Sequence, residues 1–376
     1  MSLCVNPNCP NPNNSDTALF CLSCGSKLLL KERYRPTKLL GAGGFGRTFL
    51  AVDEDIPSKP CCCVKQFQFL SQNPQALSKA SQLFKQEAVQ LDNLGKNHPQ
   101  IPSLLASFEQ DGQLYLVQEF IEGVTLDQEL EQQGVYNEAK IWQLLQDLLP
   151  VLQFIHNNKV IHRDIKPENI IRNKKGTPIL IDFGVAKLIT ETALVTQGTT
   201  VGTVDYAPPE QMRGTVYPAS DLFSLGVTCI RLMTGVRPIE MFDAQNQVWI
   251  WRQFLPSGTV ISDKLNLVLD KLIDSSLKDR YQSAEQVLQV IQYELSSPPP
   301  AELTPPTKIS TAASFQPETR IYQPSPQIPT AVSSPTSSQT SERVSPPTPP
   351  PQPDKKISHA TKFVYWLMGE KLEKLR

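Results

Sequence analysis

The chain has 376 residues, of which 40% are apolar and 19% are charged, and its formal net charge is −1 at pH 7. This composition is typical of a globular protein with two or three domains, and the near-neutral charge excludes a global attraction to nucleic acid or anionic lipid. No apolar run approaches the ~18 residues that a membrane span needs, and the polar start is unlike a signal peptide. We therefore expect a cytoplasmic protein whose 8 cysteines bind metal or pack, rather than form disulfides.

Residues 1–30 contain four cysteines with the spacing C-x4-C-x11-C-x2-C, namely Cys4, Cys9, Cys21 and Cys24. The second pair, followed by glycine, looks like a zinc knuckle, and four thiolates suit a closed tetrahedral zinc site. About 30 residues cannot bury an adequate core, so a metal would supply most of the folding free energy. A redox pair stays open as an alternative, because C-x4-C departs from the commoner C-x2-C.

Nucleic-acid binding by this zinc-ribbon-like module is not expected. Asp16 and Lys27 are its only charged side chains, so it lacks a basic footprint. Contact with protein, or regulation of the adjoining domain, fits this composition better.

Residues 34–52 form a glycine-rich pattern between two predicted strands. The first strand, residues 34–40, leads into Gly41-Ala-Gly43-Gly44-Phe45-Gly46, and the second follows at residues 49–52. A lone G-x-G-x-x-G also occurs in dinucleotide-binding folds, where a helix follows at once. The residues after this loop are β-branched and apolar, which predicts strand, loop and strand.

The next segment predicts a buried strand, a helix and a hairpin. Three cysteines and a valine precede Lys65, which could be an ordinary charge at the end of a strand. Helical spacing over residues 76–94 includes Glu87, which could be an ordinary exposed glutamate. Strands are then predicted over residues 101–108 and 114–117, with Asp111-Gly112 as the turn.

Further along, an apolar stripe predicts a helix over residues 138–157, kinked but continuous at Pro150. Short strands are predicted at residues 160–161 and 179–181. The first leads into His162-Arg-Asp-Ile-Lys-Pro-Glu-Asn169 and the second into Asp182-Phe-Gly184.

These motifs, in this order, resemble the eukaryotic-type serine/threonine protein kinases over about residues 34–296. The resemblance implies an α+β, bilobal fold with a strand-rich N-lobe at 31–118 and a helical C-lobe at 119–296. The four-cysteine module and the run Gly-Phe-Gly-Arg-Thr-Phe-Leu-Ala are similar to the four-Cys kinases of cyanobacteria. Thr48, Cys63 and Pro208 depart from the family, which usually has valine, alanine and alanine there.

The resemblance also implies ATP and Mg²⁺ as cofactors and a set of nucleotide contacts. Lys65 would pair with the α- and β-phosphates and with Glu87. The glycines over the phosphates would be Gly41, Gly43 and Gly46. The backbone contacts to adenine would be Glu119 and Ile121.

For the chemistry, the resemblance implies protein serine or threonine hydroxyls as acceptors. Asp164 would orient the hydroxyl and receive its proton, and Lys166 would neutralise the migrating phosphoryl group. Asn169 and Asp182 would hold Mg²⁺. A lysine two positions after the aspartate is the serine/threonine form of this loop.

Two scaffold contacts are expected by the same resemblance. Asp221 would accept backbone amides of the catalytic loop, residues 162–169, and Arg280 would pair with Glu210.

Residues 184–210 would be the activation segment, with Thr196, Thr199 and Thr200 as candidate phosphosites. We hypothesise autophosphorylation at Thr199 or Thr200, because an arginine before Asp164 suits a phosphate dianion. Mass spectrometry that finds no phosphate there in fully active enzyme would refute this.

Residues 297–356 hold 16 of the 33 prolines and many serines and threonines, which predicts a disordered spacer. Residues 357–376 regain apolar and basic residues and predict a short amphipathic helix. Three interpretations stay open for this helix: it docks on a partner or on its own kinase domain, it lies on a membrane surface, or it does neither.

The main alternative function is a pseudokinase scaffold that acts through the four-cysteine module and the tail. It predicts the loss of Lys65, Asp164, Asn169 or Asp182, and all four are present.

Overall fold

The structure is a computed structural model that describes residues 1–43, 46–67, 74–183 and 204–296. The chain divides into two units, Met1–Glu302 and Leu303–Arg376, and every described residue belongs to the first. The predicted spacer 297–356, the helix 357–376 and the three candidate phosphothreonines lie outside the described residues. Among the helices that are described, none is both long and apolar enough to cross a membrane.

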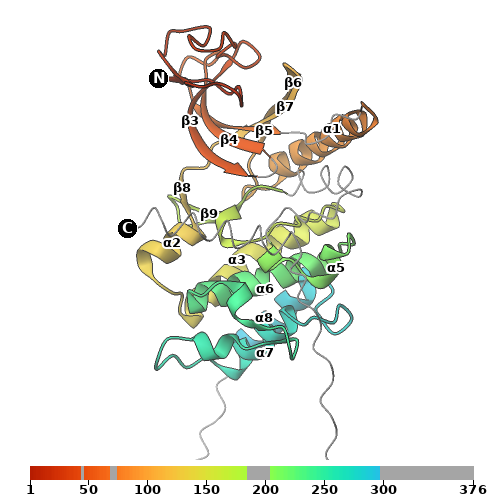
Figure 1. The fold of residues 1–376 in the computed structure, drawn as a ribbon. Helices are drawn as coiled ribbons and strands as arrows, with labels where there is room; N and C mark the ends of the chain where they lie inside the picture. The colour runs from red at the N-terminus through yellow and green to blue at the C-terminus, as the bar shows by residue number, and fades with distance from the viewer. Residues whose placement is uncertain (44–45, 68–73, 184–203, 297–376) are drawn as a thin grey trace, which may run out of the picture. The chain divides into compact units, whose positions relative to one another are not determined.

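The N-lobe is built on one antiparallel five-stranded sheet with the strand order β3-β4-β5-β7-β6. Its strands are β3 (Tyr34–Gly43), β4 (Gly46–Asp53), β5 (Cys61–Phe67), β6 (Leu104–Gln110) and β7 (Gln113–Glu119). Helix α1 (Pro74–Asn97) lies beside this sheet (Figure 1). The predicted strands around the glycine loop and at the three cysteines are therefore confirmed.

The hairpin between β6 and β7 turns at Asp111 and Gly112, whose φ angles of 50° and 69° are those of a tight primed turn. The predicted start of β6 at residue 101 is wrong. The amide of Ile101 donates to the carbonyl of His98 in a turn, and Pro102 has no amide to donate, so the strand begins at Leu104.

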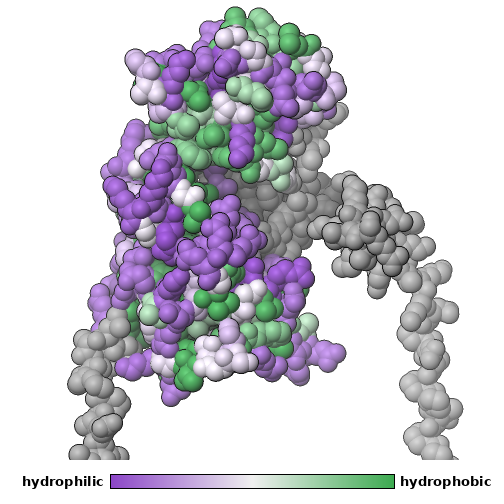
Figure 2. Space-filling view, turned by 90° about the vertical axis from the view of Figure 1, so that its left-hand side faces the viewer, coloured by the Kyte–Doolittle hydropathy of each residue, from purple (hydrophilic) through white to green (hydrophobic). Residues whose placement is uncertain are grey.

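The four-cysteine module lies against the N-lobe sheet, at the top of Figure 1. Its backbone forms one small ladder, β1 (Ser2–Leu3) with β2 (Asn13–Asn14), and its own core holds the cysteines and Leu28. Val5 and Leu30 pack into a second cluster with the sheet residues Phe49 and Val64. The module therefore buries its apolar face on the lobe. Apolar surface is visible at the top of the molecule in Figure 2. Leu22 of the module is 90% exposed.

The C-lobe is helical. Its longer elements are α2 (Leu126–Gln133), α3 (Glu138–Asn157), α6 (Pro218–Thr234), α7 (Asp263–Leu272) and α8 (Ala284–Ser296), with the short helix α5 (Pro209–Met212). A small sheet joins β8 (Gly123–Thr125), β9 (Ile170–Asn173) and β10 (Pro178–Leu180), and β11 (Phe242–Asp243) pairs with β12 (Val248–Trp249). Helix α6 is buried along nearly its whole length, so the lobe packs around it.

Helix α3 runs through Pro150 without a break, as predicted, and Pro150 lies on its exposed side. The short strand predicted at residues 160–161 is wrong. There the amide of Val160 closes the end of α3 on the carbonyl of Ile155, and two residues later the amide of His162 donates to the Asp221 side chain. The backbone donors are used by a helix end and a carboxylate, which leaves no strand ladder at this point.

Candidate active site

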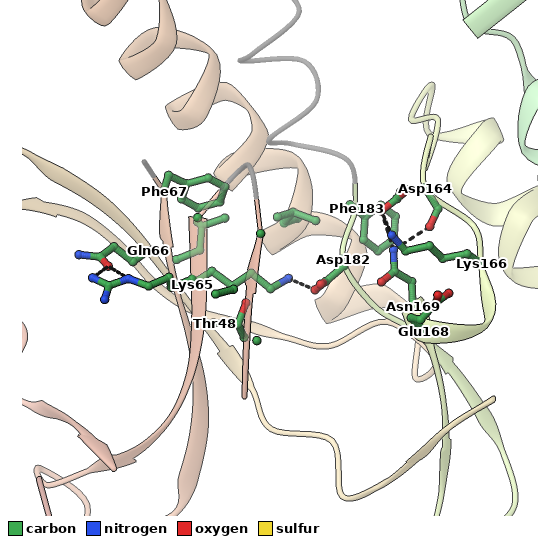
Figure 3. A pocket seen from close by; sticks show the side chains of 17 residues that line it. Thr48, Lys65, Gln66, Phe67, Asp164, Lys166, Glu168, Asn169, Asp182 and Phe183 are labelled. Carbon is green, nitrogen blue, oxygen red and sulfur yellow. Dashed lines mark hydrogen bonds and ion pairs between the residues drawn. The ribbon is translucent and has the colours of Figure 1, made fainter. Parts of the chain in front are cut away.

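A cavity of about 550 Å³ brings together residues of the N-lobe sheet and of two C-lobe loops (Figure 3). Eight residues predicted from the sequence line it: Gly41, Gly43, Gly46, Lys65, Asp164, Lys166, Asn169 and Asp182. They come from two segments, 41–65 and 164–182, whose nearest members, Lys65 and Asp164, are 99 positions apart, so the fold has gathered them into one place.

Some predicted contacts lie elsewhere. Glu119 ends β7, where its amide donates to the Ser103 carbonyl at 2.9 Å, and neither Glu119 nor Ile121 is among the residues that line the cavity. Glu87 lies on α1, and its side chain is outside the described part of the chain. The adenine contacts and the partner of Lys65 on α1 stay predictions.

Lys65 forms an ion pair with Asp182, which joins β5 to the loop after β10 (Figure 3). Burial of the Lys65 ammonium opposes its charge, but the Asp182 carboxylate outweighs this, so the pKa of Lys65 lies above its ordinary value. At neutral pH the cavity therefore contains a fixed positive charge next to a carboxylate. The Lys65 ammonium could bind a phosphate chain, and the Asp182 carboxylate could bind a metal cation.

The catalytic loop holds its three polar side chains together by direct contacts. The Asn169 side-chain amide donates to the backbone carbonyl of Asp164 and to its Oδ2, both at 2.8 Å. Lys166 Nζ lies 3.1 Å from the same Oδ2. Asp164 therefore has its carboxylate oriented by an amide donor and a cation, which is the geometry of a group that can accept a hydroxyl proton.

His162 links this loop to the segment that carries Asp182. Its Nε2 lies 3.0 Å from the Ile181 carbonyl, and the amide of Asp164 lies 3.3 Å from its Nδ1. Burial lowers the pKa of His162, so the ring is neutral at pH 7, and these partners fit the tautomer protonated on Nε2. The ring also packs on Phe183 with 4.6 Å between centroids.

Asp221, which is fully buried on α6, fixes the backbone that precedes Asp164. It accepts the amides of His162 and Arg163 at 2.8 Å each, as predicted. His156 on α3 adds a bond of 2.8 Å to Oδ2, which the sequence did not indicate. Burial opposes charge on Asp221, yet the hydrogen bond from His156 and nearby charges hold its pKa below the usual range.

Two backbone conformations in these loops are unusual. Arg163 has φ 68° and Asp182 has φ 60°, both in the left-handed region. Aspartate tolerates this region moderately well, whereas for arginine it is strained. Asp221 accepts the Arg163 amide and Gln211 donates to the Arg163 carbonyl at 2.8 Å, so both sides of the strained residue are held.

The predicted pair of Glu210 and Arg280 is present inside the C-lobe. Arg280 Nη1 lies 2.7 Å from Glu210 Oε1, and Ser220 Oγ donates to the same oxygen at 2.8 Å. The Arg280 side chain is fully buried, and its guanidinium lies 4.8 Å from the Phe223 ring centroid. The pair ties α5 to the loop before α8.

The four cysteine sulfurs of the module lie within 4.8 Å of one another. Two Sγ–Sγ distances, Cys4 to Cys24 and Cys9 to Cys21, are both 3.6 Å. The side-chain amide of Asn14 lies 3.5 Å from the Cys21 sulfur, and that of Asn6 lies 3.7 Å from the Cys24 sulfur. The structure therefore brings the four predicted ligands into one compact cluster, surrounded by N–H donors that suit thiolates.

Residues 34–291 of the chain match the family "Protein kinase domain". The chain belongs to this protein kinase family. Its N-lobe sheet, its helical C-lobe and the cavity between them are those of a kinase domain, and the alternative of a dinucleotide-binding loop is thereby excluded.

Several curated relatives of this kinase domain are bacterial. Serine/threonine-protein kinase B of Synechocystis is 43% identical over 302 residues, which is 78% of this chain and 52% of that protein. Serine/threonine-protein kinase F of Synechocystis is 40% identical over 338 residues, with 82% and 68% covered. PknA of Nostoc is 42% identical over 279 residues, with 72% and 49% covered. The chain thus spans about half the length of the first and third of these relatives.

Among solved structures, the kinase domain is similar to PpkA-294 in its apo form, with a TM-score of 0.56 and 24% sequence identity. The similarity covers 69% of this chain and 96% of that one. At this identity the likeness establishes the fold alone.

Proposed function

We propose that the chain is a serine/threonine protein kinase that transfers the γ-phosphoryl group of ATP to hydroxyls of protein substrates. The observation that carries this proposal is the convergence of Lys65, Asp164, Asn169 and Asp182 on one cavity. Four relatives at 40–43% identity that bear the name serine/threonine-protein kinase support it.

Each of these residues has a task in the proposed reaction. Lys65 would bind the phosphates that stay with the leaving ADP, and Asp164 would align the acceptor hydroxyl and accept its proton. Lys166, beside Asp164, would neutralise negative charge on the phosphoryl group during its transfer. Asn169 and Asp182 offer the oxygen ligands that Mg²⁺ prefers. The bound ion would neutralise part of the negative charge of the triphosphate.

A kinase and a pseudokinase scaffold differ in whether the chain transfers phosphate from ATP to protein. Incubation of the full chain with labelled ATP, Mg²⁺ and a generic protein acceptor should place label on serine and threonine, and not on tyrosine. Asp164→Asn keeps the size of the side chain but removes the proton acceptor, so it should lower the labelling rate by about 10²–10⁴-fold. Equal labelling by both forms would contradict the proposal, and no labelling by the wild type would favour the scaffold.

We further propose that the four-cysteine module binds one structural Zn²⁺. Four sulfurs about 2.3 Å from a tetrahedral zinc ion lie about 3.8 Å apart. The two Sγ–Sγ distances of 3.6 Å are close to this value, and all four sulfurs lie within 4.8 Å of one another, so the cluster has about the size that the ion needs.

Metal analysis tests the zinc site. We expect about one Zn²⁺ per wild-type chain and less than about a tenth of that after Cys21→Ser, because a site with three thiolates binds zinc far more weakly. Cys61→Ser is the matched control, since Cys61 is an exposed thiol on β5, outside the cluster, and should keep full occupancy. Mass spectrometry for zinc provides the measurement. Full occupancy in Cys21→Ser would exclude this ligand set.

A further inference from the structure

Two residues that line the nucleotide cavity, Arg47 on β4 and Gln66 on β5, have side chains that reach the far face of the sheet. They are cross-strand partners, and the next partners along the ladder are Thr48 and Lys65, which also line the cavity. Consecutive strand residues point to opposite faces of a sheet. Figure 3 shows this alternation: Lys65 points toward Asp182, and Gln66 points away from it.

On the far face, both side chains bind one carbonyl of the four-cysteine module. Arg47 Nη2 donates to the Val5 carbonyl, and Gln66 Nε2 donates to the same oxygen at 3.1 Å. Arg47 also donates to Gln66 Oε1, at 2.6 Å from Nη2 and 3.1 Å from Nε. Gln66 is only 2% exposed, whereas Arg47 is half-buried, so the Gln66 side chain is shielded from water and depends on its protein partners.

Val5 follows Cys4 directly, so its carbonyl is placed by the cysteine cluster. The Cys4 sulfur is within the cluster, and the Cys4 amide donates to the Pro12 carbonyl at 2.8 Å. A movement of Cys4 would therefore move the acceptor that Arg47 and Gln66 share.

The same two residues support the glycine-rich loop. Arg47 follows Gly46, the last glycine of the loop, in the chain. Gly46 has φ 144°, and a Cβ added to it would collide with the backbone carbonyl of Gln66. Gly46 thus packs against the Gln66 backbone, while the Gln66 side chain binds the module.

We propose that Arg47 and Gln66 are positioning residues through which the four-cysteine module sets the glycine-rich loop for nucleotide binding. The inference rests on the proposed function, in which this cavity takes ATP. Without the two donors, the buried Val5 carbonyl loses its partners and the loop gains freedom that nucleotide binding must then remove. The contacts among Asp164, Lys166 and Asn169 are left intact.

The test measures ADP affinity by calorimetry on the full chain with Mg²⁺. Arg47→Leu and Gln66→Leu should each raise the Kd for ADP about tenfold, which corresponds to one lost buried hydrogen bond of ordinary strength. Arg47→Lys keeps a donor and should recover part of the affinity. Thermal melting confirms that each variant is folded.

Arg35→Leu is the matched control. Arg35, on β3, also joins the sheet to the module, through Ser2 Oγ at 2.9 Å and the Ala18 carbonyl at 2.8 Å, but it does not line the cavity. We expect lower thermal stability and an ADP affinity within about twofold of the wild type. An equal loss of ADP affinity in Arg35→Leu would overturn the proposal, because docking in general would then set the loop.

Removal of zinc from the wild type and from Arg47→Leu gives a double cycle that tests whether the metal and Arg47 act on ADP binding through one another. A zinc-selective chelator should weaken ADP binding to the wild type by the same factor as Arg47→Leu, and it should have little further effect on that variant. Additive effects, or unchanged affinity in both leucine variants, would overturn the inference while leaving the proposed function in place. A wild type that binds no ADP would instead overturn the proposed function itself.

Discussion

Asp182→Ala is expected to lower phosphoryl transfer by about a thousandfold or more, since loss of one preorganised charge at a phosphoryl group costs about that much. The variant removes both a proposed Mg²⁺ ligand and the partner of the Lys65 ammonium. Single-turnover transfer from labelled ATP measures the effect on the chemical step.

The control for this variant is Asp270→Ala on α7. Asp270 forms a surface ion pair with Arg252, and both side chains are more than 40% exposed. Such pairs contribute little, so this variant should transfer phosphate at the wild-type rate. An Asp182→Ala chain that retained more than about a tenth of the wild-type rate would remove Asp182 from the proposed machinery.

Arg280→Ala is expected to lower the free energy of unfolding by about 3–5 kcal/mol, because it leaves the Glu210 carboxylate buried without its cation. Glu210 would keep the Ser220 hydroxyl as a partner, which cannot balance a full charge. Urea denaturation followed by circular dichroism gives the measurement. Arg252→Ala, which breaks the surface pair with Asp270, should change stability by less than about 1 kcal/mol.

The stability gap between wild type and Arg280→Ala should shrink in acid. In the wild type, burial opposes the Glu210 charge, but the hydrogen bonds from Arg280 hold its pKa below the ordinary value, so the pair stabilises the fold above about pH 4.3 and loses this effect below. In the variant the hydrogen bond from Ser220 remains, but without the Arg280 cation we expect burial to outweigh it and to raise the pKa of Glu210. Its penalty therefore disappears as protons bind. A gap that stayed constant from pH 7 to pH 4 would show that lost packing, not charge, destabilises the variant.

Much of the active site could be predicted from the sequence because its motifs are short and resemble those of the protein kinases. Asp164, Lys166 and Asn169 lie within six consecutive positions. Asp182 follows them after one short predicted strand. The four cysteines were predicted for the same reason. Local spacing places the members of each motif near one another, whereas their roles were predicted from the resemblance to the protein kinases.

The contacts that the sequence missed all join distant segments through ordinary polar residues. His156 meets Asp221 across 65 positions, and Gln66 meets Val5 across 61. Nothing in the local pattern distinguishes such a histidine or glutamine from a surface residue. The errors at residues 101–103 and 160–161 have the same origin, because apolar β-branched residues predict strands only where a neighbouring strand accepts their amides.

The left-handed backbone at Arg163 has a consequence for the energy of catalysis. A non-glycine residue in that region costs about 1–3 kcal/mol, and the C-lobe supplies this during folding through Asp221 and Gln211. Substrate binding therefore does not have to bend the chain into shape. In the proposed reaction, the free energy of binding ATP and the acceptor would then be available for aligning the reacting oxygens, because the backbone at Arg163 is already fixed by the C-lobe.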